Sequence, residues 1–184
     1  MIASARAGDF VKLQGALHAD PSAANPKWVA GFPAPNPVPN DSIPLFCISE
    51  AVFRKTNRAG NEYAMTRALL GAGADPEIDR GQPLTGAVSF GAIDVVKALL
   101  ESGVCPDGFH RDGLPMAFAL HFDHEAIAEL LAGRGAKLDL RFAAGLGRLE
   151  RVRNWFNADG TLKPGAGALS DPYGPLPRAA GCPL

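Results

Sequence analysis

The stretch GQPLTGAVSFGAIDVVKALLESGV at residues 81–104 can be laid without a gap over the stretch GLPMAFALHFDHEAIAELLAGRGA at residues 113–136. The same residue types recur 32 positions apart along both stretches, as in Pro83 and Pro115, Ala87 and Ala119, and Gly103 and Gly135. A repeat of this length indicates a supersecondary unit that stacks on its neighbours. The middle of the chain therefore predicts a repeat fold.

Each of the two stretches predicts a pair of antiparallel helices. A proline at the first turn of the first helix costs little, because the N–H that it lacks would have no partner there. Four residues later Ala87 or Ala119 places a small side chain where another helix comes close. A second apolar set at helical spacing predicts a longer second helix, formed around Ile93, Val96, Leu99 and Leu100 or around Ile127, Leu130 and Leu131. Gly103 or Gly135 then ends that helix in a left-handed conformation.

These residues resemble the ankyrin repeat. The signature of that family runs Thr-Pro-Leu-His-x-Ala-Ala-x-x-Gly-His and closes with Leu-Leu-x-x-Gly-Ala-Asp, and QPLTGAVSFGAIDVVKALLESGV is similar to it over the whole unit. Residues 43–53 and 65–76 resemble the two halves of an earlier unit, residues 4–17 a first unit and residues 142–156 a fifth. The resemblance implies an all-α solenoid of stacked helix-turn-helix units, about five imperfect repeats over residues 1–157.

The chain departs from the family pattern at three places. The Thr before the proline and the His after the leucine, which brace the turn in the family, are replaced by Gln82 and Thr85 in one unit and by Leu114 and Ala117 in the next. We therefore expect looser turns. Pro44 precedes Pro83 by 39 residues instead of 32, so residues 54–63 are expected to lengthen either a helix or a turn. The last connection is short, and it predicts the loss of the projecting loop, or finger, that precedes the first helix of a unit.

Two segments rich in proline interrupt or follow the repeats. In residues 25–41 four alternating prolines, Pro33, Pro35, Pro37 and Pro39, predict an extended path. This segment is either a connector held by Trp28 and Phe32 or a ligand for a proline-recognising domain. The tail at 158–184 predicts no sixth unit. Either the tail folds back through Leu162, Leu169 and Tyr173 over part of Trp155 and Phe156, or the chain resembles the N-terminal part of a longer ankyrin protein. We expect a tail that is extended and poorly ordered from about Gly174, and self-association through the uncovered end is a further possibility.

Composition limits the classes of function. Hydrophobic residues make up 47% of the 184 residues, charged residues make up 20%, and the formal net charge is −1. A chain with this hydrophobic content folds, and its nearly neutral net charge provides no overall electrostatic attraction to nucleic acid or to an acidic membrane surface. It has neither a membrane-spanning apolar run nor a signal-like start, and its three cysteines form no disulfide framework. We therefore expect a soluble cytoplasmic protein that binds neither nucleic acid nor membrane.

Chemical motifs are sparse. The densest group of possible metal ligands is His121, Asp123, His124 and Glu125, with Cys105, Asp107 and His110 one repeat earlier. His124 stands where the family has its turn histidine, so we expect it to brace a turn, and Glu125 suits the start of a helix. No phosphate-binding loop or serine elbow is present. We expect no metal, no cofactor and no catalytic residue. The alternative is a small-molecule binder or enzyme that uses this His/Asp/Cys group.

The resemblance implies binding of another protein through residues that the fold does not need. The finger residues are Glu77, Asp79, Arg80 and Gln82 on one finger and Phe109, His110, Arg111 and Asp112 on the next. The short-helix residues are Ser89, Phe90, His121 and Phe122. We expect Phe90, Phe109 and Phe122 to be either apolar anchors or rings packed between repeats. Six basic residues against two acidic ones over 134–153 indicate either a surface for an acidic partner or a solvated face.

Overall fold

The computed structural model describes residues 1–27, 38–164 and 166. Within these ranges the regular structure is α-helix and short 3₁₀-helix, with one isolated antiparallel bridge between Phe156 and Leu162. The expected all-α class is therefore confirmed. In the same ranges no helix is both long and apolar enough to cross a membrane.

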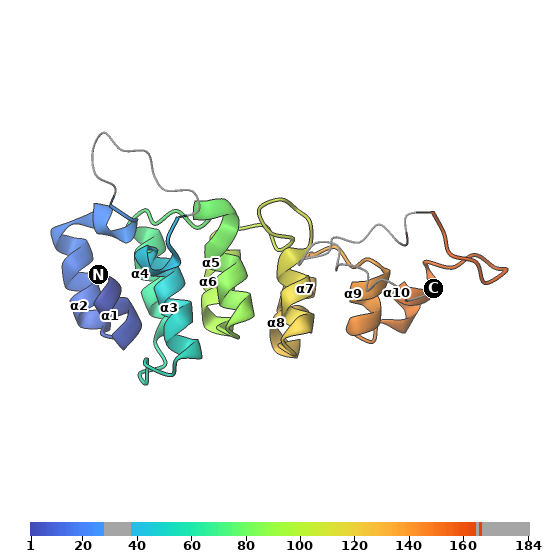
Figure 1. The fold of residues 1–184 in the computed structure, drawn as a ribbon, viewed down its shortest axis with the longest axis horizontal. Helices are drawn as coiled ribbons and strands as arrows, with labels where there is room; N and C mark the ends of the chain where they lie inside the picture. The colour runs from blue at the N-terminus through green and yellow to red at the C-terminus, as the bar shows by residue number, and fades with distance from the viewer. Residues whose placement is uncertain (28–37, 165, 167–184) are drawn as a thin grey trace, which may run out of the picture.

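The helices of the described part form pairs that follow one another in a row (Figure 1). The pairs are α1 (Ile2–Ala7) with α2 (Phe10–Ala19), α3 (Pro44–Phe53) with α4 (Glu62–Gly71), α5 (Ile78–Ser89) with α6 (Ile93–Glu101), α7 (Leu114–His121) with α8 (Glu125–Gly133), and α9 (Leu140–Gly145) with α10 (Leu149–Arg153). The 3₁₀-helices η1 (Pro21–Ala24) and η2 (Asn40–Ser42) lie between the first and second pairs. We number the pairs one to five along the chain.

Successive pairs contact each other through equivalent helices. The first helices pack in the order α1, α3, α5, α7 and α9, and the second helices α2, α4, α6 and α8 pack in a parallel row. A continuous apolar core runs between the two rows and includes Leu13, Ile48, Met65, Leu84, Leu99, Met116 and Leu131. Ala87 and Ala119 are fully buried, as expected where helices come close. Each pair thus buries its apolar side only against its neighbours.

Left-handed residues end the helices at regular places. The second helices of pairs two, three and four are followed by Gly73, Gly103 and Gly135, with φ of 88°, 98° and 92°. The amide after each glycine bonds back to a helix carbonyl, as in Val104 N to Leu99 O at 3.4 Å. This is a Schellman arrangement, which satisfies carbonyls that the helix end leaves free. The left-handed stops expected at Gly103 and Gly135 are confirmed.

The turn inside each pair also contains a left-handed residue soon after the first helix, and the longer turn of pair two contains a second one, Gly60, with φ of 63°. Pairs one, three and five use Gly8, Gly91 and Gly147, with φ of 67°, 70° and 63°. Pairs two and four use Lys55 at 54° and Asp123 at 59°. Glycine takes this conformation at no steric cost, whereas an L-residue with a side chain is strained in it. Pairs two and four therefore have a residue with a side chain at a position where glycine would be favoured.

The extra length of pair two is shared between its first helix and its turn, because α3 ends nine residues after Pro44 whereas α5 and α7 end six residues after Pro83 and Pro115. Helix α3 ends at Phe53 and α4 begins at Glu62, so residues 54–61 connect them. Two side chains fasten this turn to pair one. Thr56 Oγ1 donates to the carbonyl of Arg6 at 2.6 Å, and Asn61 Nδ2 donates to the carbonyl of Gly8 at 3.0 Å.

Helix α5 contains a left-handed stretch ahead of its regular part, which begins where the sequence predicts. It starts at Ile78, five residues before Pro83, where the proline pattern placed the first turn. Asp79, Arg80 and Gly81 have φ of 49°, 60° and 79°, so a left-handed turn precedes the regular helix. Pro83 therefore lies in the first turn of the regular part, where its missing N–H costs little.

Both proline-rich segments lie partly outside the described residues. The predictions for the first segment concern Trp28, Phe32, Pro33, Pro35 and Pro37, which lie outside the described residues. Those for the tail concern Leu169, Tyr173 and the boundary at Gly174, which also lie outside them. The described start of the tail folds back on itself. Asn157 N donates to Thr161 O and Lys163 N donates to Trp155 O, both at 2.8 Å, and Leu162 itself stays exposed.

Candidate functional site

The predicted binding residues lie at the two opposite ends of the first helices. The finger residues precede α5 and α7 or begin α5, whereas Ser89, Phe90, His121 and Phe122 lie at the C-terminal ends of these helices. An eight-residue helix such as α7 spans about 12 Å. The structure therefore divides the predicted set into two surfaces.

The two fingers contact each other through Gly81 and Phe109. A Cβ atom at Gly81 would lie 3.1 Å from the Cβ of Phe109, so only glycine permits this approach without a shift. Phe109 is 46% exposed, and its ring meets the ring of His110 edge to face at 4.9 Å between centroids. Figure 1 shows the connection between α6 and α7, which contains this finger, as a projecting loop. We call Glu77, Asp79, Arg80, Phe109, His110, Arg111 and Asp112 the finger surface.

The finger surface carries charged residues on strained backbone. Asp79, Arg80 and Arg111 have positive φ, which costs an L-residue about 1–2 kcal/mol. Arg80 and Arg111 are exposed and form no ion pair with another described residue. Gln82 behaves differently, because its Nε2 donates to Asn40 Oδ1 at 3.0 Å and so ties α5 to η2. We therefore assign Gln82 to the scaffold.

Asp107 holds the second finger against pair five. Its carboxylate is buried and accepts from Lys137 N at 2.7 Å, while its carbonyl accepts from Gly113 N at 3.0 Å. A small pocket of about 250 Å³ opens beside it, between Arg111 and Phe142. The finger is thus braced at its base, and Phe109, His110 and Arg111 are exposed at its tip.

The Phe90 ring packs between pairs two and three, whereas the Phe122 ring is exposed to solvent. The Phe90 ring is half-buried and lies 5.5 Å from the Phe46 ring and 5.0 Å from the Phe53 ring, centroid to centroid. Phe122 is 43% exposed, and its nearest rings are those of His121 at 4.8 Å and Phe118 at 5.9 Å. Of the two alternatives for the aromatic residues, packing therefore holds for Phe90, and exposure suits Phe109 and Phe122 as anchors.

His124 and Ser89 connect pair three to pair four. His124 Nε2 lies 3.3 Å from the carbonyl oxygen of Ser89, and a carbonyl can only accept, so Nε2 is the donor in this contact. Ser89 Oγ in turn donates to the carbonyl of Thr85 at 2.8 Å. His124 thus has the turn-bracing position that its place in the repeat predicts. Ser89 is engaged in the fold.

The His/Asp/Cys group does not converge. Cys105 and His110 precede α7, whereas His121 and His124 follow its last turns. Among residues 1–27, 38–164 and 166, no three His, Cys, Asp or Glu side chains form a group that could hold a metal ion. The alternative of an enzyme or small-molecule binder built on this group therefore finds no shared site in the described residues.

The buried thiol of Cys47 is poorly suited to act as a nucleophile. Burial raises the pKa of Cys47 to about 11, against an ordinary value of 9.0, and the thiol lies 3.6 Å from the carbonyl of Asp41. The thiolate is the reactive form, and it is scarce at neutral pH when the pKa is this high.

Most of the basic residues over 134–153 are already paired. Arg134 lies 3.7 Å from Glu101, Arg153 lies 2.6 Å from Glu150, and Arg148 pairs with Glu129. Arg141 lies 3.8 Å from Asp139, and its guanidinium lies over the Phe142 ring at 4.4 Å. Glu101 and Glu129 lie outside this stretch, so the pairs neutralise half of its excess of positive charge, which favours the interpretation as a solvated face.

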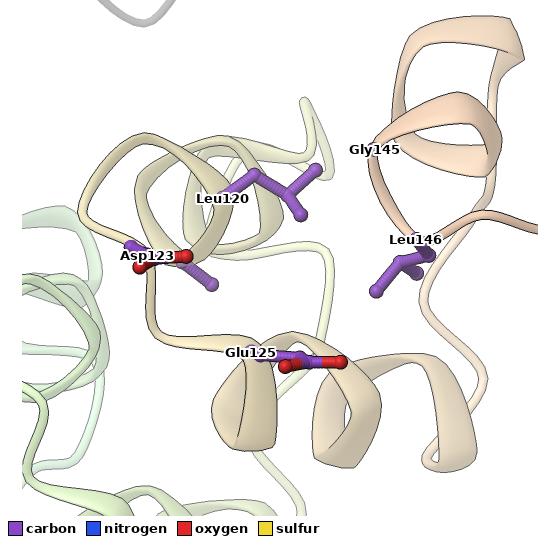
Figure 2. Close-up of a pocket in the computed structure, with 6 residues that line it drawn as sticks. Leu120, Asp123, Glu125, Gly145 and Leu146 are labelled. Atoms are coloured by element: carbon purple, nitrogen blue, oxygen red, sulfur yellow. The ribbon is translucent and has the colours of Figure 1, made fainter.

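A groove between pairs four and five is the feature that the sequence did not reveal (Figure 2). Its volume is about 350 Å³, and its lining comes from the C-terminal ends of α7 and α9, from the α7–α8 turn and from the first residue of α8. In Figure 2 Leu120 points towards Gly145, where a Cβ atom would lie 2.8 Å from Leu120 Cδ1. The carboxylates of Asp123 and Glu125 lie along the same groove.

Comparison of the chain with protein-family models, with curated proteins and with solved structures finds no match.

Proposed function

We propose that this chain is an ankyrin-type repeat protein that binds another protein through the finger surface. The observation that carries the proposal is the contact of two neighbouring fingers at Gly81 and Phe109, which places an exposed aromatic ring among unpaired arginines. Aromatic and arginine side chains dominate binding energies at protein interfaces. Strained backbone at Asp79 and Arg80 is typical of residues kept for function.

The ankyrin assignment rests on the repeat itself. The 32-residue offset, the buried alanines at equivalent positions and the stacking of helices in two rows all fit that architecture. In such a stack the fold needs the core positions, while the finger tips are free to take any residue. Charged and aromatic residues at those tips are therefore best explained by a partner. We propose no catalytic activity and no cofactor.

The experiment that tests this proposal is capture of partners by the full chain, followed by titration of the partner that is found. The Phe109→Ala and Arg80→Ala variants should each weaken binding of that partner at least roughly tenfold, the loss typical of a hot-spot residue. Val11→Ala is the control, because Val11 is 80% exposed on α2, in pair one. Equal binding by all four proteins would overturn the finger surface as the site.

Self-association is a second candidate for the C-terminal end. Leu149 and Leu162 there are 56% and 52% exposed, and α10 is the last helix of the described residues. A Leu149→Lys variant should then abolish any concentration-dependent association in sedimentation measurements. A wild-type chain that is monomeric at all concentrations would contradict this candidate.

We also propose that the protein is cytoplasmic. Cys47 and Cys105 are free thiols in the described residues, and free thiols persist in a reducing compartment.

A further inference from the structure

The turns inside pairs two, three and four form one continuous edge of the molecule. The Phe53 ring at the end of α3 stacks on the Phe90 ring in the turn of pair three, at 5.0 Å between centroids. The His124 ring in the turn of pair four lies against Gly91, where a Cβ atom would be 2.9 Å from it. Figure 1 shows these turns on the side of the row opposite to the finger between α6 and α7. We call this surface the turn edge, and it consists of residues 53–61, 90–92 and 122–125.

The two ends of the turn edge carry opposite charges. The turn of pair two contains three basic residues and no acidic one. Two of them, Lys55 and Arg58, are exposed and form no ion pair with another described residue. At pair four Asp123 and Glu125 are exposed and also have no ion pair within the described residues, and residues 122–125 contain no lysine or arginine. The turn edge is therefore basic at one end and acidic at the other.

The middle of the turn edge is uncharged and partly apolar. The turn of pair three consists of Phe90, Gly91 and Ala92. Phe53 packs on Phe90 and is itself 64% exposed, more than any other aromatic side chain in the described residues. An apolar centre between charged flanks is the usual arrangement of a protein interface.

The basic end of the turn edge is fixed in place by hydrogen bonds. Its turn is longer than that of pair three, and Thr56 and Asn61 fasten it to backbone carbonyls of pair one. Within the turn Asn57 Nδ2 donates to Asn61 Oδ1 at 2.9 Å. Lys55 and Arg58 are therefore carried on an ordered backbone, which reduces the entropy that binding costs.

The two charged ends are too far apart to neutralise each other within one chain. Packed helices lie about 8–10 Å apart, so ends that are separated by a whole pair lie roughly 20 Å apart. This distance exceeds the Debye length of about 8 Å at physiological salt, so their attraction is screened. A second copy related by a two-fold axis through the turn of pair three places its acidic end on the basic end of the first copy, and its basic end on the acidic end.

We propose that the chain forms a two-fold symmetric dimer through the turn edge. Lys55 and Arg58 of each copy meet Asp123 and Glu125 of the other, and the Phe53 rings of both copies lie at the centre. A second copy is the occupant because the edge carries both charges on either side of an uncharged centre, a pattern that is complementary to itself. The dimer leaves both finger surfaces free, so it goes beyond the function proposed above and does not depend on it.

The first test is sedimentation of the full chain over a dilution series. The wild type should dimerise, and high salt should weaken the dimer. Leu149→Lys, which would abolish association through the C-terminal end, should leave this dimer unchanged. Lys137→Glu is a charge reversal on an exposed side chain between α8 and α9, outside the turn edge, and should also leave it unchanged. A wild type that stays monomeric, or a dimer that resists salt or is disrupted by either of these variants, would overturn the proposal.

Two charge-reversal variants give the sharper test. Lys55→Glu with Arg58→Glu makes both ends of the edge acidic, and Asp123→Lys with Glu125→Lys makes both ends basic. Each variant alone should dimerise at least roughly tenfold more weakly than wild type, because like charges then face each other. An equal mixture of the two should form a mixed dimer about as tight as the wild-type dimer, because unlike charges meet again at both contacts.

This rescue by mixing keeps the test decisive, because a variant that had only lost its fold could not be rescued by another. If the mixture fails to associate, or if each variant alone dimerises like the wild type, the turn edge is not the interface. Neither result bears on the finger surface, which is tested by its own partner.

Discussion

Pairs three and four come from the two most similar stretches of the chain, yet they expose different residues. Phe90 and Phe122 occupy the same position, 32 residues apart. Phe90 packs on Phe46 and Phe53 of pair two, whereas pair three has Thr85 where pair two has Phe46, so Phe122 lacks an equivalent ring from its preceding pair. Whether the ring at this position is exposed thus depends on the side chains that the preceding pair places against it.

The largest expected difference between the two pairs comes from removing these rings. Phe90→Ala should lower the free energy of unfolding by roughly 2–4 kcal/mol, somewhat less than for a fully buried ring, because it opens a cavity against Phe46 and Phe53. Phe122→Ala should change it by less than about 1 kcal/mol. Urea denaturation measures both. Similar losses for the two variants would show that the register of the pairs is wrong.

The alanines on the first helices should respond alike in both pairs. Ala87 and Ala119 are fully buried, so Ala87→Leu and Ala119→Leu should each cost about 1–3 kcal/mol through overpacking. The same denaturation experiment gives the two values. A neutral result for one variant would mean that its first helix is not closely packed against the next.

How much the sequence predicts depends on whether a feature is local. The pairs, the buried alanines and the stops at Gly103 and Gly135 follow from spacing within one unit, and the structure confirms them. The groove does not follow from spacing, because Gly145 approaches Leu120 only once two pairs are stacked. The burial of Phe90 needs partners from another pair for the same reason.

The extra residues of pair two illustrate the same limit. Spacing locates them at residues 54–63 but leaves open whether the first helix or the turn is lengthened, and the structure lengthens both. The lengthened turn is held by the contacts of Thr56 and Asn61 with backbone carbonyls of pair one. These partners lie more than forty residues away and leave no local pattern in the sequence.

In pair two, Glu50 occupies the position that Ser89 has in pair three and His121 has in pair four. Glu50 accepts from Arg6 and from Arg54, at 2.9 Å each. Burial opposes its ionisation, but the two guanidinium groups outweigh burial and hold the pKa of Glu50 below the ordinary 4.5. A depressed carboxyl pKa stabilises the fold above the pKa of the unfolded chain, and that stability is lost as the pH falls through the folded pKa.

Glu50→Gln should therefore lower the melting temperature by about 2–4 °C at neutral pH, as expected for a loss of about 1 kcal/mol in a chain of this size. The difference from wild type should shrink as the pH is lowered below 4.5. Glu77→Gln is the matched control, since Glu77 is exposed and has no ion pair with another described residue. A deficit that stays constant down to acid pH would mean that packing of the Glu50 side chain, and not its charge, joins pairs one and two.

The smallest expected effect comes from the left-handed position in the turns of pairs three and four. Asp123 is left-handed at the position where pair three has Gly91, so Asp123→Gly should raise the free energy of unfolding by roughly 0.5–1 kcal/mol. The reverse change, Gly91→Asp, should destabilise, because its φ is 70° and a Cβ atom there would lie 2.9 Å from the His124 ring. Thermal melts measure both changes. A loss of stability in Asp123→Gly would show that the Asp123 side chain is kept for the fold.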